Sequence, residues 1–495
     1  MTMDYTSVAP LFQTDAYKLG HLQQYGLAGD VTGVYSNYTN RGSRIPDIGA
    51  VVHFGLQAFL ERYADSFRVF FAADEDQVCQ AYEARLASIL GPNTIGSAHI
   101  RALHRLGFLP LRFCAVPEGT AVPLRIPSFT IENTHPDFFW LTNYIETVLS
   151  AEIWQASTTA TIAKAMRETL EIAATRTGTP LAAVDWQGHD FSYRGMSSNE
   201  TAAMSGAAHL LSFTGTDSLV SIDWIERHYG GAFVAGSVPA TEHSVMCAGI
   251  ATVGERELFE GLLGLYPSGI VSVVSDTFDL WRVLTEYLPA LREEVLARDG
   301  KLVIRPDSGN PVDILCGVEE GAPDAGPAER KGVIELLWDT FGGTVNAAGY
   351  KELDPHIGAI YGDSITRERA VLITERLAAK GFASGNVVFG MGSFGYQYQT
   401  RDTFMSAIKA TWIQVDGRGV DIRKDPVTDS GTKKSATGRL AVVTDADGRM
   451  RLIERATPAE EAESLLQPIW EDGSFVRRQT FPEVRAVLAK QTVLR

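Results

Sequence analysis

Seven apolar, β-prone segments between residues 184 and 395 each lead into polar or glycine-rich residues that could bind a ligand and act on it. Among these endings are Asp217, Arg305-Pro306-Asp307 and Gly362-Asp363-Ser364. Most of the segments are followed by an amphipathic helical pattern, and alternating strand and helix signals predict a parallel sheet. The active groups of closed α/β barrels lie in the loops that follow the strands. The pattern therefore predicts both an α/β barrel and the position of its site.

Two neighbouring strand endings have the composition of a phosphate-binding site. Gly390-Met391-Gly392-Ser393-Phe394-Gly395 follows one strand, and glycines let backbone amides approach an anion closely. Gly362-Asp363-Ser364 opens a helix after the preceding strand, where the first amides of a helix favour a phosphate. A glycine cluster alone is about as often a tight turn. The pair favours phosphate binding, because barrel enzymes often bind phosphate near their last strands.

Arg305 and Asp307 place a cation and a carboxylate almost side by side at a strand end, in a loop made rigid by two prolines. An isolated pair of this kind is usually a structural salt bridge. Here Asp276 and Asp363 follow other strands of the same set. Their carboxylates could orient ribose hydroxyls or bind water on Mg²⁺, which prefers oxygen ligands and substrate phosphates.

His243 follows Ser237-Val238-Pro239, and a cap residue with a proline is typical of a helix start. We therefore expect His243 near a helix N-terminus, where the dipole favours a neutral, nucleophilic imidazole and would stabilise an anionic phosphohistidine. A lone histidine is more often a structural residue, so both interpretations stay open.

Phe191 and Asp217 could together recognise a flat ring that carries an amide. An aromatic side chain at a strand end can stack on a heteroaromatic ring, and a carboxylate accepts a hydrogen bond from an amide NH₂. Arg194 adds a cation nearby. The alternative for Phe191 is a place in the core, where most phenylalanines lie.

Residues 1–150 lack the alternation of strand and helix and predict an α+β domain, while residues 151–395 form the barrel domain. Strand patterns cover 34–38, 51–54 and 111–115, and helical patterns cover 56–68, 74–90 and 158–175. Residues 396–495 predict a helix over 401–411 and hairpins at Asp416-Gly417 and Asp447-Gly448. We assign this tail to the first domain.

Local signals inside the barrel region predict two helix caps and one insertion. Ser197 and Glu200 have the spacing of a capping box, and Asp363 or Ser364 is expected to cap the helix that runs to Lys380. Residues 317–332, rich in Gly, Pro, Ala and Glu, predict an exposed insertion.

The composition excludes several classes of protein. A formal net charge of −16 disfavours a nucleic-acid partner, because phosphate contacts need a dominant basic field. The sequence has no run of about eighteen apolar residues for a membrane span and no basic-then-apolar secretion signal, so we expect a cytoplasmic protein without a membrane partner. The four cysteines lack CxxC or histidine pairing, which indicates reduced thiols. Because the net charge is negative, an anionic ligand would need positive charge concentrated at its own binding site.

Several stretches resemble, in order along nearly the whole chain, the nicotinamide phosphoribosyltransferase family of type II phosphoribosyltransferases, which is related to nicotinate phosphoribosyltransferase. They include LFQTDAYKLGH (11–21), GHDFSYRGMSS (188–198), GTDS (215–218), SVPATEHS (237–244), VVSDTFD (273–279), IRPDSGNPVD (304–313), YGDSI (361–365) and RKDPVTD (423–429). The resemblance implies the irregular α/β barrel of that family and the reaction of nicotinamide with phosphoribosyl pyrophosphate to nicotinamide mononucleotide and pyrophosphate, in NAD salvage. It also implies Mg²⁺ bound mainly through substrate phosphates, and stimulation by ATP through a phosphohistidine.

The resemblance also implies a role for individual residues. Nicotinamide would be bound by Phe191, Asp217, Arg194 and Tyr17 of the partner subunit, so that a homodimer shares its sites. Ribose and phosphate would be bound by Ser237, Ser275, Arg305, Gly362, Asp363, Gly392 and Ser393, and the diphosphate by Arg41, Arg401, Lys409 and Lys424. The catalytic group would be His243, the residue that ATP phosphorylates, with Asp276, Arg305 and Asp307; no residue is expected to bind a metal directly.

Two alternatives remain open. Nicotinate is the closest rival substrate, but a carboxylate at Asp217 would repel an acid and accept from an amide. A non-catalytic sensor of nucleotide or phosphoribosyl pyrophosphate would bind without releasing pyrophosphate.

Overall fold

The chain folds into two compact units in a computed structural model that describes residues 6–231, 234–319, 324–428 and 434–491. Of the described residues, unit 1 comprises 6–161, 226–231, 399–428 and 434–491, and unit 2 comprises 162–225, 234–319 and 324–398. The main boundaries between the units fall after residues 161 and 398, whereas the boundaries predicted from the sequence were after residues 150 and 395. The first boundary lies inside one long helix, α6 (Glu146–Thr177).

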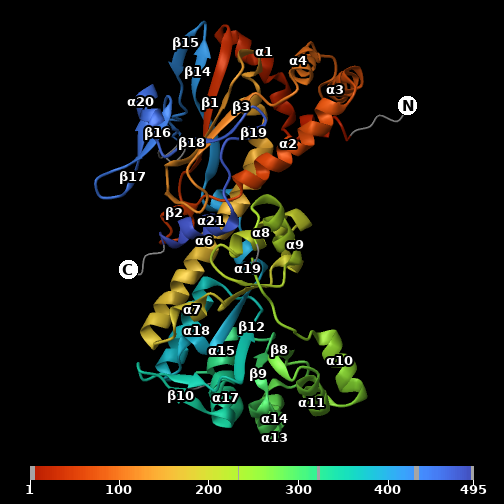
Figure 1. Cartoon of the computed structure of the whole chain (residues 1–495), viewed down its shortest axis with the longest axis vertical. Helices are drawn as coiled ribbons and strands as arrows, with labels where there is room; N and C mark the ends of the chain where they lie inside the picture. Colours follow the sequence, from red (N-terminus) through yellow and green to blue (C-terminus); the bar gives the residue numbers. More distant parts are fainter. Residues whose placement is uncertain (1–5, 232–233, 320–323, 429–433, 492–495) are drawn as a thin grey trace. The chain divides into compact units, whose positions relative to one another are not determined.

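Unit 1 is built on an antiparallel sheet that joins the two ends of the chain. Its seven strands follow the order β15 (Arg418–Asp421), β14 (Ser406–Val415), β1 (Val31–Asn40), β5 (Pro127–Asn133), β3 (Leu111–Ala115), β18 (Gln467–Glu471) and β19 (Ser474–Phe475). The tail enters this sheet twice, because β14 pairs with β1 and β18 pairs with β3 (Figure 1). The predicted α+β domain made from the N-terminal region and the tail is confirmed.

Three amphipathic helices share one apolar core with this sheet: α2 (Leu56–Ala72), α3 (Glu75–Leu90) and α4 (Ala98–Leu106). In α2, Phe59, Phe67 and Phe70 are buried at helical spacing. Asp74 caps α3 by accepting a hydrogen bond from the backbone NH of Gln77. The helices predicted over 56–68 and 74–90 are confirmed.

The helix predicted over residues 401–411 is wrong. Only a 3₁₀ turn over Arg401–Thr403 forms, and β14 begins at Ser406. β14 pairs with β1 along most of its length, and this pairing buries Ala407 and Ile408. Tertiary pairing therefore outweighs the local helix signal. The hairpins predicted after β14 and at Asp447-Gly448 are present, the second between β16 (Leu440–Thr444) and β17 (Met450–Glu454).

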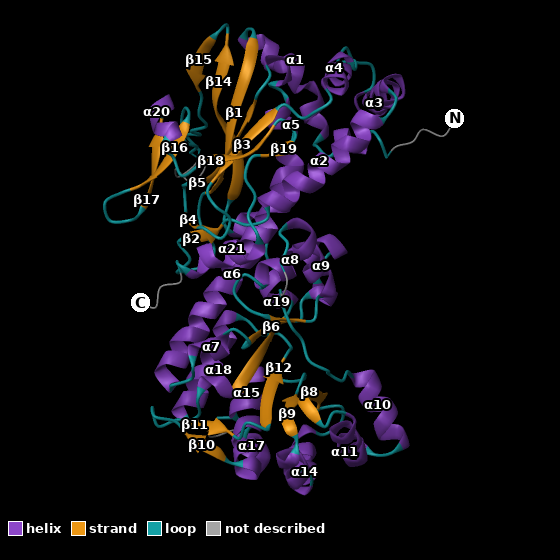
Figure 2. Ribbon diagram, viewed as in Figure 1, coloured by secondary structure: helices purple, strands orange, loops and turns teal. Residues whose placement is uncertain are grey.

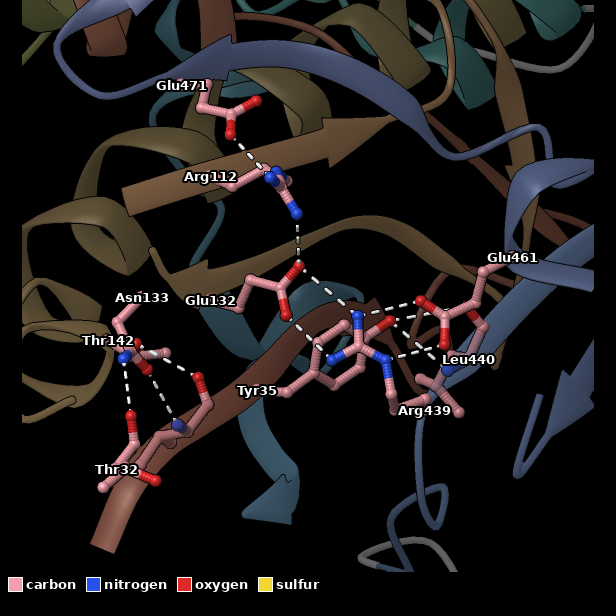
Figure 3. Close-up of polar contacts among 11 residues, drawn as sticks. Thr32, Tyr35, Arg112, Glu132, Asn133, Thr142, Arg439, Leu440, Glu461 and Glu471 are labelled. Carbon is pink, nitrogen blue, oxygen red and sulfur yellow. Dashed lines mark hydrogen bonds and ion pairs between the residues drawn. The ribbon is translucent and has the colours of Figure 1, made fainter. Parts of the chain in front are cut away.

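A network of ion pairs ties the tail to the N-terminal strands of unit 1 (Figure 3). The Arg439 guanidinium donates to Glu132 at 2.8 Å and to both carboxylate oxygens of Glu461 at 2.6 and 2.8 Å. Its carbon lies 4.6 Å from the centre of the Tyr35 ring. Arg112 extends the network by bridging Glu132 and Glu471. Paired geometry and partial burial make this network stronger than an ordinary surface ion pair.

Replacing Arg439 with methionine should lower the free energy of unfolding by about 2 kcal/mol, because two half-buried carboxylates lose their shared cation. Urea denaturation measures the change. Arg455→Met is the matched control, since the Arg455–Asp421 pair is more exposed, at 62% and 37%, and should contribute under about 0.5 kcal/mol. Equal destabilisation by the two substitutions would contradict the role assigned to the network.

Unit 2 contains a six-stranded, wholly parallel sheet (Figure 2). The strand order is β7 (Gly215–Thr216), β6 (Gly188–Asp190), β13 (Val387–Met391), β12 (Ile357–Tyr361), β9 (Asp299–Arg305) and β8 (Ser268–Val274). Helices α15 (Pro311–Cys316), α17 (Val333–Phe341) and α18 (Arg367–Ala379) share its apolar core. The parallel α/β sheet predicted from the sequence is confirmed.

One short segment links the two edge strands of this sheet and so curls it into a barrel. Gly236 exchanges backbone hydrogen bonds with the β7 region, through the NH of Thr216 and the carbonyl of Thr214. A few residues later, Pro239 and Thr241 bond to Ser272 of β8. Residues 234–241 therefore join the ring through isolated bridges in place of a full strand, which makes the barrel irregular.

The first two predicted strands of the barrel are misplaced. Residues 181–184 form a short helix, and the strand is Gly188–Asp190; Phe213 lies in a turn before β7. A Cβ on Gly188 would lie 2.7 Å from the Phe213 ring, so close packing selects the glycine for the strand. The apolar residues that suggested these strands lie in the core beside the observed strands. The third predicted strand, 232–234, falls partly outside the described residues.

Local caps also differ from the sequence prediction. The capping box before α8 (Asn199–His209) joins Ser198 to Thr201 instead of Ser197 to Glu200. The cap of α18 is Thr366, because Ser364 adopts a positive φ of 52° and cannot begin a helix. Within the predicted insertion, Pro327–Lys331 forms a helical turn.

Candidate active site

The carboxyl ends of the parallel strands meet at one edge of the barrel and carry most of the predicted site residues. These are Phe191 after β6, Asp217 after β7, Asp276 after β8, Arg305 at the end of β9, Gly362 after β12 and Gly392 after β13. Contacts between their side chains and loops join these endings into one cluster.

Phe191 lies at the centre of this cluster. The Arg305 guanidinium carbon lies 4.9 Å from the centre of its ring. A Cβ on Gly390 would lie 2.3 Å from a carbon of the same ring and would force a shift, and one on Gly362 would lie at a tight 3.0 Å, so the ring packs closely against both glycines. The Phe191 NH donates to the Met391 carbonyl at 3.0 Å, which fixes the loop after β6 to β13. Half-buried Phe191 is therefore a fixed aromatic surface beside a cation.

Asp276, Asp307 and His243 continue the cluster. Asp276 Oδ2 accepts from the backbone NH of Asp307 at 2.7 Å, and the Asp307 carboxylate lies 3.8 Å from Arg305. His243 Nε2 lies 3.6 Å from Asp276 Oδ1. Asp276 Oδ1 is buried and accepts no hydrogen bond from the described residues. A buried carboxylate oxygen without a donor is suited to a ligand hydroxyl or a metal-bound water.

His243 is the first residue of α10 (His243–Thr252), and its side chain is 48% exposed. The predicted position at a helix N-terminus is confirmed, although Glu242 takes the N-cap position. The ring is therefore accessible to a ligand bound at the strand ends.

Two hydrogen-bond donors fix the Asp217 carboxylate, and both bind the same oxygen atom, Oδ1. His189 Nε2 lies 3.0 Å from Asp217 Oδ1, and the Ser237 hydroxyl donates to the same atom. Burial alone would raise the pKa of Asp217, but the hydrogen bonds from His189 and Ser237 and the charge of Arg305 lower it below its usual value. Asp217 is therefore ionised at neutral pH, and its Oδ2 has no hydrogen-bond donor among the described residues.

The predicted phosphate-binding residues are divided between exposed loops and the core. Asp363 is exposed, and Gly392 precedes a short helical turn that begins at Ser393. A Cβ on Gly195 would lie 2.3 Å from the Ser393 side chain, so the loop carrying exposed Arg194 packs against this turn. Ser275 is fully buried, and its hydroxyl donates to the Val273 carbonyl at 2.7 Å.

In unit 1, the four predicted diphosphate-binding cations line a single pocket of about 200 Å³, here called the cation pocket. Its charged residues are Arg41, Arg401, Lys409, Lys424 and Glu146. Burial lowers the pKa of Lys409, against the opposing charge of Glu146, whose carboxylate lies 3.5 Å away. The four cations come from β1, β14 and the loops around them, and they exceed the acidic charge in the pocket by three. Such a pocket is suited to a polyanion.

Tyr17 also belongs to unit 1, on a 3₁₀ turn over Ala16–Gly20, and its ring is 65% exposed. An exposed tyrosine ring of this kind is available for stacking on another flat group.

Comparisons with known proteins show the family to which this chain belongs. The model of the "Nicotinate phosphoribosyltransferase (NAPRTase) family" matches residues 186–467. A nicotinamide phosphoribosyltransferase of Acinetobacter baylyi is 48% identical, with 98% of each chain covered, and one of Xanthomonas campestris pv. campestris is 38% identical, with 96% of this chain and 97% of the relative covered. The chain belongs to the nicotinate phosphoribosyltransferase family. It is therefore a pentosyltransferase.

Two solved structures share the fold at low sequence identity. Nicotinate-nucleotide pyrophosphorylase from Pyrococcus furiosus matches with a TM-score of 0.56 at 17% identity, over 99% of this chain and 97% of that one. Human nicotinic acid phosphoribosyltransferase matches with a TM-score of 0.55 at 17% identity, over 96% and 93%. The irregular barrel with its second α+β unit is thus a phosphoribosyltransferase architecture.

Two residues, one at the strand ends of unit 2 and one in the cation pocket of unit 1, were not assigned a role from the sequence. His189 contacts both Asp217 and the Phe191 ring, at 4.9 Å between ring centres. Its signal was the two-residue spacing from Phe191, which puts both side chains on one face of a strand. Glu146 lies in the cation pocket, and its position at the start of a long helix gave no such signal.

The described residues contain no group of three or more His, Cys, Asp or Glu side chains placed to hold a metal ion. Among the same residues, no helix is long and apolar enough to cross a membrane.

Proposed function

We propose that this chain transfers the phosphoribosyl group of phosphoribosyl pyrophosphate to nicotinamide, which gives nicotinamide mononucleotide and pyrophosphate in NAD salvage. The observation that carries the proposal is the ionised carboxylate of Asp217, fixed by His189 and Ser237 with Oδ2 left open. An anionic acceptor binds the amide NH₂ of nicotinamide and repels the carboxylate of nicotinate. The names of the two bacterial relatives support the same choice.

The residues at the strand ends suit the bond changes of this transfer. The bond between the anomeric carbon and pyrophosphate oxygen breaks, pyrophosphate leaves with the electron pair, and the pyridine nitrogen forms the new bond. Positive charge develops on the ribose, and the Asp276 and Asp307 carboxylates are suited to stabilise it. Phe191 orients the ring, so no general base is required.

The leaving pyrophosphate needs compensating positive charge. The four cations of the cation pocket are suited to bind this anion, and Mg²⁺ bound mainly through the substrate phosphates would add positive charge. Among the described residues the protein offers no complete metal cage, and Asp276 Oδ1 fits a water on such an ion.

The purified protein should convert nicotinamide and phosphoribosyl pyrophosphate, with Mg²⁺, into equal amounts of mononucleotide and pyrophosphate. Chromatography of the nucleotide and an enzymatic pyrophosphate assay measure both products. Tight binding of phosphoribosyl pyrophosphate without release of pyrophosphate would instead identify a non-catalytic sensor.

We further propose that ATP stimulates the reaction by phosphorylating His243, which is exposed at the start of α10 beside Asp276. His243→Ala should abolish the stimulation by ATP and leave a slow, ATP-independent transfer. Initial rates with and without ATP test this, and His356→Ala, at a histidine paired with Asp354 before β12, is the matched control. Stimulation by ATP that persists in His243→Ala would contradict a role for a phosphohistidine at this position.

We also propose a homodimer in which Tyr17 of the partner subunit stacks on the nicotinamide opposite Phe191. Mixing inactive Tyr17→Ala and Asp217→Ala subunits should restore up to about a quarter of the activity, because some hybrid sites then carry neither substitution. Rates are measured after subunit exchange, which labelled subunits verify. Complete exchange without any recovery would show that each site belongs to one subunit.

A further inference from the structure

Asp190 is the last residue of β6, and it stands in the chain between two residues of the candidate site, His189 and Phe191. The rings of His189 and Phe191 are 4.9 Å apart and so lie on one face, and the side chain between them points to the opposite face. Asp190 is fully buried there, and its hydrogen bonds to other described residues come only from uncharged groups. A buried carboxylate without a paired cation costs stability, which indicates that this position serves another purpose.

The Asp190 carboxylate is hydrogen-bonded to two loops. Oδ1 accepts from the backbone NH of Ser192 at 2.9 Å and from its hydroxyl at 2.6 Å. Oδ2 accepts from the Thr216 hydroxyl at 3.0 Å, which in turn accepts from the NH of Ser218 at 3.0 Å. The Asp190 carbonyl also accepts from the NH of Asp217 at 3.1 Å. These bonds connect the loop after β6 to the loop after β7.

Each of these loops carries one residue that is suited to contact a pyridine ring. Ser192 directly follows Phe191, and Thr216 directly precedes Asp217. Ser192 and Thr216 are 0% and 3% exposed, so water does not compete for their bonds to Asp190. One carboxylate therefore fixes the stacking ring and the amide acceptor relative to each other.

Helix α8 closes the protein around this carboxylate. A Cβ on Gly206 would lie 2.9 Å from Asp190 Oδ2 and 2.0 Å from the Ser221 hydroxyl, so a larger residue would force a shift. The glycine allows α8 to pack directly against the carboxylate and to exclude water from it.

We propose that Asp190 is a positioning residue for the pyridine substrate, whose buried carboxylate holds Phe191 and Asp217 at the spacing that lets one stack on the ring while the other accepts from the amide. The inference rests on the proposed function, since it takes Phe191 and Asp217 as the groups that bind the pyridine. Asp190 itself acts only through them, because its side chain is buried behind the loops. A displacement of about 1 Å at a site of this kind can cost up to about a hundredfold in rate.

Replacing Asp190 with asparagine tests the role, because it keeps the size of the side chain but puts an NH₂ group where one oxygen accepts. We expect the KM for nicotinamide to rise about tenfold, with the KM for phosphoribosyl pyrophosphate within about twofold and kcat within about threefold of wild type. A purely structural role would reduce the amount of folded enzyme, which lowers the apparent kcat and leaves both KM values unchanged. Steady-state rates with each substrate varied separate these results.

Two substitutions that each remove one bond of Asp190 keep the inference testable if Asp190→Asn does not fold. Ser192→Ala should raise the KM for nicotinamide and for nicotinate by the same factor of about three, because stacking on Phe191 does not distinguish the two rings. Thr216→Val should lower the ratio of kcat/KM for nicotinamide to that for nicotinate about fivefold, because Asp217 makes that distinction.

Two control variants show whether these effects belong to the Asp190 bonds. Thr216→Ser keeps the hydroxyl and should retain the wild-type ratio. Thr374→Val is the matched control, since Thr374 is also buried in unit 2 and its hydroxyl donates to carbonyls of its own helix, α18. It should leave both KM values and the ratio unchanged.

An unchanged KM for the pyridine in Asp190→Asn, or an unchanged ratio in Thr216→Val, would overturn the positioning role. Turnover by the wild-type protein separates this inference from the proposed function. If wild type converts only nicotinate, the proposed function fails, and the KM for nicotinate then tests Asp190. If wild type converts neither pyridine, the proposed function also fails, and calorimetric binding of nicotinamide to wild type and Asp190→Asn decides the role of Asp190.

Discussion

Replacing Arg305 with alanine is expected to lower kcat/KM for phosphoribosyl transfer by about a thousandfold. Arg305 is 13% exposed, its guanidinium lies over the Phe191 ring, and it pairs with Asp307 at 3.8 Å. The substitution removes a cation that is expected to contact the phosphate. It also leaves the Phe191 ring and the Asp307 carboxylate without their charged neighbour. Steady-state rates with both substrates varied measure the effect.

Two other substitutions define what Arg305 contributes. Arg305→Lys keeps the charge but loses the planar group that lies on Phe191, so about a hundredfold loss is expected. Arg298 is a buried arginine just before the opposite end of β9, and it donates to the Tyr266 carbonyl. Arg298→Ala should reduce stability while leaving kcat/KM within about threefold. A loss below tenfold in Arg305→Ala would contradict the site.

Replacing Asp217 with asparagine should lower kcat/KM for nicotinamide by about a hundredfold, because a neutral amide replaces the charged acceptor. Nicotinate should be affected far less, since repulsion of its carboxylate disappears. The ratio of the two kcat/KM values measures this. Asp223→Asn, at an exposed carboxylate on the following helix, is the control and should leave the ratio unchanged. An unchanged ratio in Asp217→Asn would overturn the choice of nicotinamide.

The pH dependence of Asp217 gives this prediction a second readout. The pKa of Asp217 is lowered, so its charge is present above that pKa and is lost as the pH falls through it. His189→Leu removes a donor, raises the pKa and should move the acid limb of the nicotinamide profile to higher pH. His189→Gln keeps an N–H near the position of Nε2 and should restore most of the wild-type profile.

The sequence predicted the strands with long apolar runs and missed the short polar ones. β8, β9, β12 and β13 were predicted within a few residues, because branched apolar residues at a parallel sheet leave a clear signal. β6 is the tripeptide Gly188–Asp190, and it is a strand only through its long-range contact with β13 and β7. That contact joins residues that the local pattern treats separately.

Some features of the candidate site could likewise be predicted from the sequence, and others could not. The polar endings could be predicted because parallel strands bring their carboxyl ends to one edge. The hydrogen bond of His189 to Asp217 and the inward hydroxyl of Ser275 depend on side-chain directions that the sequence does not encode locally. The grouping of Arg41 with Arg401 and Lys409 depends on the pairing of β1 with β14, where local propensity indicated a helix instead.

The ratio of kcat/KM for nicotinamide to that for nicotinate, measured on the purified protein at neutral pH with Mg²⁺ and with and without ATP, tests the central claim most directly. The ionised Asp217 predicts a ratio above about 100 in favour of nicotinamide under both conditions. A ratio near one, or a preference for nicotinate, would contradict it.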